Sequence, residues 1–432
     1  MANALVTSTI ITNEVLRIAH NTSAFLGNMS TDYDKNWKGQ YKPGSIVNAR
    51  RPVQFTHRTG AAANVQDITE SSVPITVQPE LGIDFAVSNS ELALSIGSNG
   101  DVNPDFKMRY LKPAGLKIAA ILDFSIGSVF KNAIYNFVGT PGTGPSTIAD
   151  VLNAKVPAQN ASLPAGDFYA ALSPNSNATV VAGLATLFNS QSMLADNYKT
   201  GVIKTALGLD FVMSQNLPTH TVGPLGGTPV VNGANQGLIN AGAVDNPYAA
   251  TTSLITNGWT AAAATRLNVG DVITLGTGGG VGVYAVNPET KAQVGTSAAD
   301  LQRFVVTATV ASDGAGNLTA VIAPAIIAGG AYQNVSSRPA AGATITIVSG
   351  SANVAYPQNI LWHREALTFV SPDQELPKGM DMAYTASMAD DGGISLRFVR
   401  GFDLTNNRFI SRFDVLWGIG VTKPEWAVRR TS

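Results

Sequence analysis

Hydrophobic and polar positions alternate along the segment that spans residues 46–88. Three short runs carry the alternation: Val53–His57, Val73–Val77 and Ile83–Val87. A period of two is typical of a strand with one buried face. Pro52 and Pro74 favour edge strands, because proline has no N–H to donate to a sheet. The segment is therefore predicted to form a long two-stranded arm that reaches away from a core.

The strongest helical pattern lies within residues 104–138. Apolar residues recur there at spacings of three and four, namely Leu122, Ile126, Val129, Phe130, Ile134 and Phe137. Pro113 predicts a kink or a restart near the beginning of the helix. Gly139, followed by Pro141 and Gly142, predicts its end.

The flanking segments carry weaker signals. Thr12–Ala19 predicts a short capped helix in an N-terminal arm that has too few apolar residues to form a core alone. Strands are expected at Phe168–Leu172 and Leu209–Met213, and helices at Ala178–Asn189 and Ser192–Leu207.

The composition changes between Pro218 and Pro357. This stretch contains nine charged residues but 20 of the 42 glycines of the chain. Its apolar runs are Val272–Leu275, Phe304–Val310, Leu318–Ile322 and Ala343–Val348, separated by Gly, Asp and Asn turns. Short strands with glycine turns predict a small β-barrel or sandwich. Mixed composition returns from residue 358, which indicates that this domain is inserted into another.

The overall composition narrows the function further. The 432 residues carry a net charge of −1, and 13% of them are charged, against about a quarter in a typical soluble domain. A low share of charged residues suits a surface that is buried against copies of the same chain. The sequence has no stripe of basic residues of the kind that binds a nucleic-acid duplex. The chain has no cysteine, so disulfides and thiolate chemistry are excluded. Neither a signal peptide nor an apolar run of about 18 residues is found, so no membrane partner is expected.

The tail from Asn359 to Arg430 carries no chemical motif but has a characteristic order. Its pieces are Asn359-Ile360-Leu361-Trp362-His363-Arg364-Glu365-Ala366-Leu367, Ser371-Pro372, Leu376-Pro377-Lys378-Gly379-Met380 and the run from Arg412 to Glu425. This order resembles the tail of tailed-phage coat proteins with the HK97 fold. The similarity is greatest to the branch typified by the short-tailed phage P-twenty-two.

The resemblance implies an α+β fold of the HK97 type with an inserted all-β, barrel-like domain. The implied parts are an N-terminal arm at 1–45, the extended E-loop at 46–88, a peripheral domain at 89–163 with a spine helix at 104–138, an axial domain at 164–217, the inserted domain at 218–357, and a return to the axial and peripheral domains with a C-terminal sheet at 358–432. The segment 46–88 contains no lysine, so the isopeptide cross-link of some HK97-fold shells is not expected.

The same resemblance implies a major capsid protein that performs no catalysis. Copies would assemble as pentamers and hexamers into an icosahedral shell around double-stranded DNA, which is enclosed without sequence specificity. The implied partners are a scaffolding protein during assembly and a portal protein at one vertex. The protein would be made in the host bacterial cytoplasm and reside in the virion. The alternative from another class is a secreted β-rich adhesin or surface-layer protein; an enzyme with a β-barrel appendix is disfavoured by the lack of a convergent polar cluster.

The candidate site residues concern contacts between proteins. Arg50, Arg51, Arg58, Asp67 and Glu70 lie on the predicted E-loop and either form salt bridges to a neighbouring subunit or remain solvated. Glu14 either contacts a scaffolding protein or is an ordinary acid in the first turn of a helix.

Signals for other chemistry are weak, and no catalytic, cofactor or metal site is expected. The loop Gly276–Gly282 lacks the Lys-Ser/Thr of a phosphate loop, and the four histidines show no metal-binding spacing. Arg429 and Arg430 offer only weak evidence for contact with DNA. The polar loop Asn287–Gln293 is a candidate for contacts between capsomers.

Overall fold

The computed structural model describes residues 8–31, 42–63, 65–66, 68, 70–88, 107–185, 205–206, 208–239, 246–276, 282–376, 385–391, 394–406 and 408–432. The chain divides into two compact units, which are described separately. The first comprises Met1–Ala49, Pro74–Ile126 and Thr368–Gly420. The second comprises Arg50–Val73, Gly127–Leu367 and Val421–Ser432.

In the first unit, helix α1 (Ser8–Thr22) packs on the long helix α4 (Lys112–Ala133), of which the residues up to Ile126 belong here. A Cβ added to Gly115 of α4 would lie 2.9 Å from Ile18 Cγ2, so glycine permits the close approach of the two helices. The apolar side chains of the N-terminal segment are buried, among them Val15, Leu16, Phe25 and Leu26. The segment predicted as a thin arm therefore contributes to a core.

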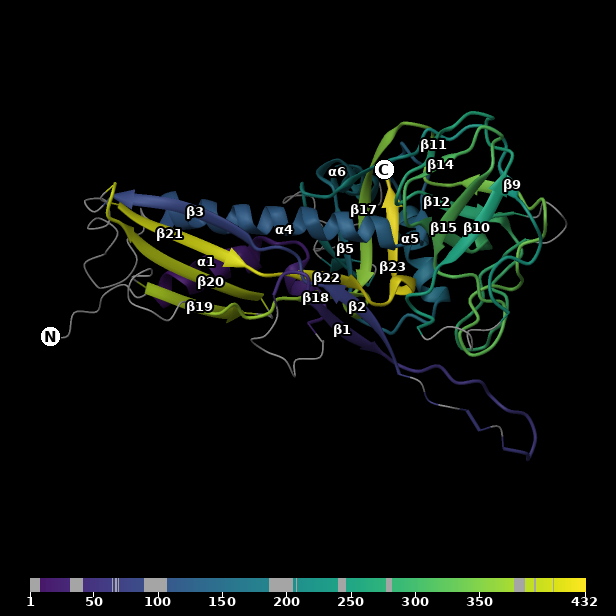
Figure 1. Cartoon of the computed structure of the whole chain (residues 1–432), viewed down its shortest axis with the longest axis horizontal. Helices are drawn as coiled ribbons and strands as arrows, with labels where there is room; N and C mark the ends of the chain where they lie inside the picture. Colours follow the sequence, from purple (N-terminus) through teal and green to yellow (C-terminus); the bar gives the residue numbers. More distant parts are fainter. Residues whose placement is uncertain are drawn as a thin grey trace. The chain divides into compact units, whose positions relative to one another are not determined.

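A four-stranded antiparallel sheet completes the first unit (Figure 1). Its order is β19 (Thr385–Asp391), β20 (Ile394–Asp403), β21 (Arg408–Val415) and β3 (Leu81–Ser88). Phe398 and Phe413 pack with ring centroids 4.8 Å apart at its centre. Strand β3, which alternation had placed in the extended arm, thus pairs along its whole length with β21.

The remainder of the predicted arm forms a ribbon only at its root. Strand β1 (Ile46–Arg51) pairs with β2 (Ser71–Thr76), and residues 53–57 form no strand. In the first unit, Val47, Ala49, Ile75 and Val77 of this ribbon pack with Val370 and Leu416. Val370 is the last residue of β18 (Leu367–Val370), which pairs with β22 (Gly418–Val421), and Leu416 lies just before β22.

The helix predicted over 104–138 ends earlier than expected. A π-helical turn at Lys107–Leu111 precedes α4, which restarts around Pro113 and ends at Ala133; residues 104–106 lie outside the described part. Phe137–Val138 forms strand β4, parallel to β23 (Ala427–Thr431). The Asn136 side chain donates to the carbonyls of Glu425 and Ala427, both at 3.1 Å, and so holds the chain in this sheet.

The second unit contains a mixed seven-stranded sheet. Its order is β4, β23, β17 (Ala355–His363), β5 (Phe168–Leu172), β7 (Leu209–Met213) and β6 (Thr205–Ala206), and β8 (Thr219–Thr221) also pairs with β17. The predicted strands at Phe168–Leu172 and Leu209–Met213 are confirmed. Strand β17 ends at His363, where a 3-10 turn, Arg364–Ala366, begins.

Two helices pack on this sheet and share its core. Helix α5 (Ile148–Asn160) was not predicted; Thr147 and Asp150 form a capping box at its start. Helix α6 (Pro174–Ala185) begins four residues before the predicted Ala178, because Pro174 suits a first helical turn. Of the helix predicted at Ser192–Leu207, residues 192–204 and 207 lie outside the described part.

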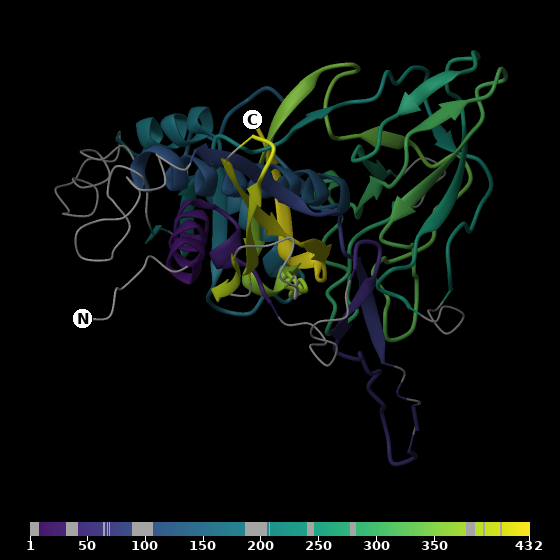
Figure 2. The same ribbon diagram turned by 60° about the vertical axis from the view of Figure 1, so that its left-hand side comes forward.

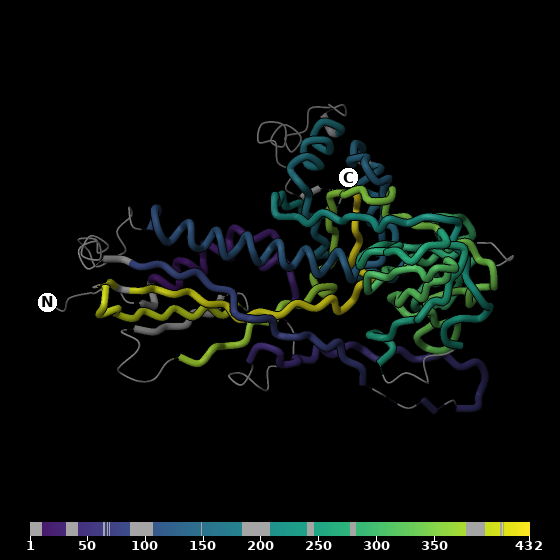
Figure 3. The backbone as a smooth tube through the Cα atoms, turned by 45° about the horizontal axis from the view of Figure 1, so that its top comes forward, coloured from purple at the N-terminus to yellow at the C-terminus, as the bar shows by residue number. Residues whose placement is uncertain are grey.

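The glycine-rich segment after Pro218 folds as β-structure (Figure 2), and Figure 3 traces its backbone in teal and green. A six-stranded sheet has the order β16 (Ile345–Ile347), β12 (Val272–Leu275), β13 (Arg303–Val306), β15 (Leu318–Ala323), β10 (Thr252–Asn257) and β9 (Val230–Val231). Strands β11 (Ala264–Leu267) and β14 (Val310–Ser312) form a second, small sheet. Leu254, Phe304, Val306 and Ile322 belong to one core cluster within this segment. Of the loop Gly276–Gly282, residues 277–281 lie outside the described part of the chain.

Candidate functional site

The segment between β1 and β2 exposes apolar side chains. Its residues from 52 to 70 form no strand where the structure describes them, and they run out and back as one excursion (Figure 2). Phe55 is 60% exposed, Val65 89% and Ile68 69%. Exposed apolar side chains on a segment without a core of its own mark a surface that gains stability by docking. We call residues 52–70 the extended loop.

The extended loop is ordered by its own polar groups. The amide of Gln66 accepts from the Thr56 N–H at 2.9 Å and donates to the Thr56 carbonyl at 2.7 Å, as a neighbouring strand would. At the tip, the Arg58 guanidinium donates to the carbonyls of Gly60 and Ala62. Arg58 therefore organises the tip turn while remaining exposed.

The predicted ionic residues at the root of the extended loop divide into two kinds. Arg50 and Glu70 form an exposed pair with 3.6 Å between Nη1 and Oε2. Arg51 is buried instead, paired with Glu425 and stacked 3.5 Å from the ring centroid of Tyr248. Arg51 thus has a role inside the chain, since its charge is compensated there. Asp67 lies outside the described residues.

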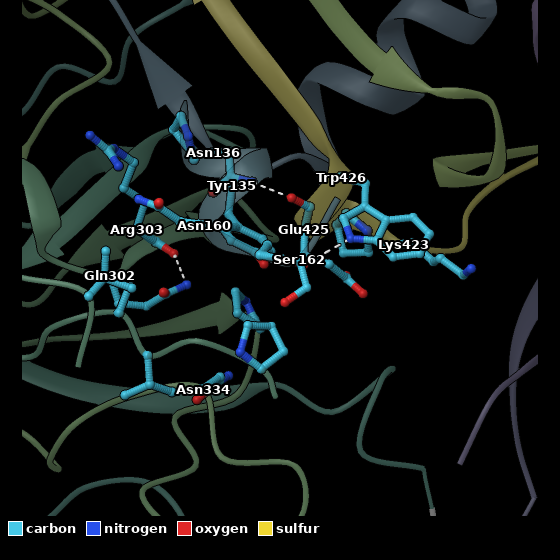
Figure 4. Close-up of a pocket in the computed structure, with 18 of the residues that line it drawn as sticks. Tyr135, Asn136, Asn160, Ser162, Gln302, Arg303, Asn334, Lys423, Glu425 and Trp426 are labelled. Atoms are coloured by element: carbon cyan, nitrogen blue, oxygen red, sulfur yellow. Dashed lines mark hydrogen bonds between the residues drawn. The ribbon is translucent and has the colours of Figure 1, made fainter. Parts of the chain in front are cut away.

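A cavity of about 810 Å³ lies beside the loop root, within the second unit (Figure 4). Its labelled lining residues include Tyr135, Asn136, Arg303, Glu425 and Trp426. Burial lowers the pKa of Arg303, and the nearby charge of Asp300 partly offsets this shift. The Trp426 indole donates to the Ala161 carbonyl at 3.0 Å. No histidine is among the described lining residues.

A buried polar cluster surrounds Asp271, which directly precedes β12 in the β-rich segment. Asp271, fully buried, accepts from His220 Nε2 at 2.8 Å, Ser349 Oγ at 3.1 Å, Gly223 N at 3.1 Å and Asn268 N at 2.8 Å. We call Asp271 and these four partners the basal cluster. Sequence reasoning missed it, because His220 and Asp271 are 51 positions apart and neither belongs to a motif.

The arginines of the C-terminal strand are buried, contrary to a contact with DNA. Arg429 is 0% and Arg430 5% exposed. Arg429 Nη2 donates to the Gly270 carbonyl at 2.9 Å, and desolvation lowers the pKa of Arg429 to about 9 although Asp271 opposes this shift. Their strand, β23, is an interior strand of the seven-stranded sheet, between β4 and β17.

Glu14 lies in the second turn of α1, because the helix begins at Ser8, and so it is not a first-turn acid. Its carboxylate lies 2.7 Å from both Arg17 Nη2 and Lys107 Nζ. The hydrogen bond from Arg17, followed by that from Lys107, holds the pKa of Glu14 below its ordinary value even though burial opposes this.

Two further properties bear on the class of protein. Among the described residues, no group of three or more His, Cys, Asp or Glu side chains is placed to hold a metal ion. The helical stretch Lys107–Ala133 is long and apolar enough to cross a membrane, and half of its most apolar window is buried. Asp123 within it is 2% exposed and accepts from Ser23 Oγ and, at 3.0 Å, from Ala24 N. The core helix of a soluble protein has these same properties.

The comparisons with known proteins identify the class as a viral coat protein. A family model described as "P22 coat protein - gene protein 5" matches residues 39–429. The chain belongs to the P22 coat protein family.

Solved phage structures show a distant similarity. That of Mycobacterium phage Che8 is 11% identical, with a TM-score of 0.40 over 90% of this chain and 84% of the other. The mature capsid of bacteriophage PhiM1 is 11% identical, with a TM-score of 0.41 over 95% and 86%. These scores are too low to define the fold, so the assignment rests on the family match. No curated protein matches the chain significantly.

Membership of this family settles the general function. The protein is a phage major capsid protein that self-assembles into the shell of the virion, and it is a structural protein and not an enzyme. The family and the function predicted from the tail motifs are confirmed. The alternative of a secreted adhesin or surface-layer protein is not supported.

Proposed function

We propose that the chain builds its icosahedral shell in the manner of the HK97 type. In this assignment, α4 and the four-stranded sheet are the peripheral domain, and the seven-stranded sheet is the axial domain. Residues 218–357 are the inserted β domain, which is supported by the core cluster that this segment forms from its own strands. Copies would be arranged as pentamers and hexamers.

The extended loop is the part that joins one subunit to the next. The observation that carries this proposal is the exposure of Phe55, Val65 and Ile68 on a segment without a core. Burying an exposed aliphatic side chain contributes about 1.5–3 kcal/mol, so docking of two or three per subunit is substantial in a repeated lattice. A neighbouring copy is the partner available at every position of a shell.

Charges on the loop would set the register of this contact. Arg50 and Glu70 are exposed and adjacent, and Arg58 is exposed at the tip. Exposed pairs contribute about 0–1 kcal/mol each, so we assign them to alignment and not to affinity. Asp67 belongs to the same proposed contact by its place in the sequence.

Three further partners belong to the proposal. A scaffolding protein would meet the N-terminal segment at Glu14, where it must compete with Arg17 and Lys107 for the carboxylate. A portal protein would occupy one vertex. Double-stranded DNA would be enclosed without sequence specificity, as a chain with a net charge of −1 suits containment better than tight binding. Synthesis would take place in the host bacterial cytoplasm.

Substitution of the apolar loop residues tests the proposal. In the double variant Val65→Ser, Ile68→Ser, shell formation should fall at least tenfold while the monomer keeps its melting temperature, because both side chains are exposed before assembly. The matched control is Ile255→Ser, which removes a 47% exposed aliphatic side chain from β10. Light scattering and negative-stain microscopy measure assembly. Normal shells from the double variant would refute the docking role.

The scaffold contact is tested with Glu14→Gln, which keeps the size of the side chain but not its charge. A scaffolding protein that recognises this carboxylate should bind the variant several-fold more weakly, as measured by calorimetry. The control is Glu289→Gln, on an exposed loop of the β-rich segment. Equal binding of the parent and Glu14→Gln would remove Glu14 from the interface.

A further inference from the structure

We propose that the β-rich segment latches the root of the extended loop and thereby fixes the direction in which the loop leaves its own subunit. The loop latch consists of Arg51, Asn246, Tyr248, Lys291 and Glu425. All five residues belong to the second unit. The consequence for assembly rests on the proposed function, whereas the latch itself is a property of the single chain.

The latch holds both strands of the loop root. On the outgoing side, just past the end of β1, the Tyr248 hydroxyl donates to the Pro52 carbonyl at 2.8 Å, and Lys291 Nζ donates to Gln54 Oε1 at 3.2 Å. On the returning strand, the Asn246 side chain donates to the Ser72 carbonyl. A ribbon held on one strand can still pivot about that contact. Contacts on both strands fix its direction as well as its position.

Arg51 is the centre of the latch. Its side chain is 6% exposed, with the Tyr248 ring over the guanidinium and the Glu425 carboxylate at one end. A buried guanidinium requires its carboxylate partner, because an uncompensated charge is costly away from water. The neighbouring Arg50–Glu70 pair lies in solvent and imposes no such requirement. The position of the root therefore depends on Arg51 far more than on Arg50.

Tyr248 is oriented before it meets the loop. Its ring packs edge-on against Tyr332, with centroids 5.3 Å apart and planes at 87°. Desolvation raises the pKa of Tyr248 to about 12, partly offset by Arg51, so the phenol remains a donor at neutral pH. The packed ring therefore holds its protonated hydroxyl in a fixed position from which it donates to the Pro52 carbonyl.

The latch also gives a role to the loop Asn287–Gln293. This turn is stabilised by the Asn287 side chain, which accepts from the amides of Glu289 and Thr290, and Lys291 within it has a φ of 57°. The turn presents Lys291 to Gln54 of the same chain. Burial lowers the pKa of Lys291. The inserted segment thus helps to fix the direction of the extended loop through contacts from two separate places, residues 246–248 and residue 291.

Release of the latch would free the loop without unfolding the sheets. The β1–β2 ribbon anchors the root, but residues 52–70 have no strand partner where the structure describes them, so beyond the ribbon the latch contacts hold the start of the loop. A shell subunit with its latch closed would present the loop at one angle. Opening the latch would allow the loop to dock at another.

Spin-label distances in the monomer test the latch, and the absence of cysteine makes labelling simple. Cysteines at Ala61, at the loop tip, and Thr319, exposed on β15, give one distance distribution by double electron–electron resonance. We expect a narrow distribution in the parent and one at least twice as wide in Arg51→Ala. The matched control, Arg50→Ala, should keep the parent width.

A second variant keeps the test valid if Arg51→Ala fails to fold. Tyr248→Phe keeps the ring against Tyr332 but removes the hydroxyl that donates to Pro52, so it should widen the distribution less while leaving the melting temperature unchanged. A parent distribution that is already broad, or Arg51→Ala and Tyr248→Phe distributions as narrow as the parent's, would overturn the latch. Because these are monomer measurements, their failure leaves the docking role of Val65 and Ile68 to be judged by assembly alone.

Discussion

Removal of the Asp271 carboxylate should destabilise the second unit more than any exposed acid of the same segment would. In Asp271→Ala, the N–H groups of Gly223 and Asn268 lose their acceptor. Ser349 can turn its hydroxyl and His220 can change tautomer, but the two backbone amides have no such freedom. The two unpaired backbone amides therefore set the minimum loss in the free energy of unfolding.

The magnitude follows from their burial. A buried donor left without an acceptor costs about 1–3 kcal/mol, and Gly223 N is buried whereas Asn268 N is partly buried. The variant also removes the charge that offsets Arg429. We expect a total loss of about 3 kcal/mol or more, against about 5–15 kcal/mol for a whole domain. For a unit of this size, that corresponds to a melting temperature lowered by about 6–12 °C.

Differential scanning fluorimetry and hydrogen exchange measure the effect. The amides of Gly223 and Asn268 should lose protection first in Asp271→Ala. The matched control is Asp313→Ala. Asp313 accepts from Ala315 N at 2.9 Å and from Asn317 N at 2.8 Å, but it is exposed, so water replaces the lost acceptor. Equal melting temperatures for the two variants would refute the reasoning that burial makes Asp271 costly to remove.

Three further outcomes are expected. Because the folded-state pKa of Glu14 is lowered from 4.5, the stability that its ionised carboxylate contributes is present above pH 4.5 and is lost as the pH falls below that value. Hydrogen exchange of the α1 amides in the parent should therefore become faster at low pH. Exchange of α1 that does not respond to this change in protonation would contradict the prediction. Gly183→Ala should destabilise α6, because the new Cβ would lie 1.9 Å from the Ser146 carbonyl oxygen; unchanged thermal melting would contradict the packing. Arg429→Met should lower the melting temperature less than Asp271→Ala does, because Nε and Nη1 of Arg429 are buried without a partner whereas Asp271 keeps its hydrogen-bond donors; an equal or larger loss would show that the arginine charge is needed.

Local patterns predicted the elements that a short stretch of sequence determines. The apolar runs at Val272–Leu275 and Leu318–Ile322 form β12 and β15, because short apolar runs bounded by turn residues define a strand. The apolar spacing from Leu122 predicted α4, although not its end. The end depends on Asn136, whose side chain binds the carbonyls of Glu425 and Ala427, and no pattern near residue 136 reveals a partner 289 positions away.

The site was less predictable for the same reason. The charged residues of the extended loop were found because they stand in a segment poor in apolar core positions. That Arg51 is buried and Arg50 exposed follows from Glu425 and Tyr248, which come from distant parts of the chain. Phe55 alternates with polar neighbours as in a strand, but no second strand lies beside it among the described residues. Tertiary contacts override such local preference.

Assembly of the purified chain tests the central claim most directly. The chain should be concentrated alone, and also with a scaffolding protein, and examined by sedimentation velocity and negative-stain microscopy. The account predicts closed shells, or curved lattices of pentamers and hexamers, that disappear in the Val65→Ser, Ile68→Ser variant and persist in Ile255→Ser. A parent chain that remains a folded monomer at every concentration, with and without the scaffolding protein, would contradict it.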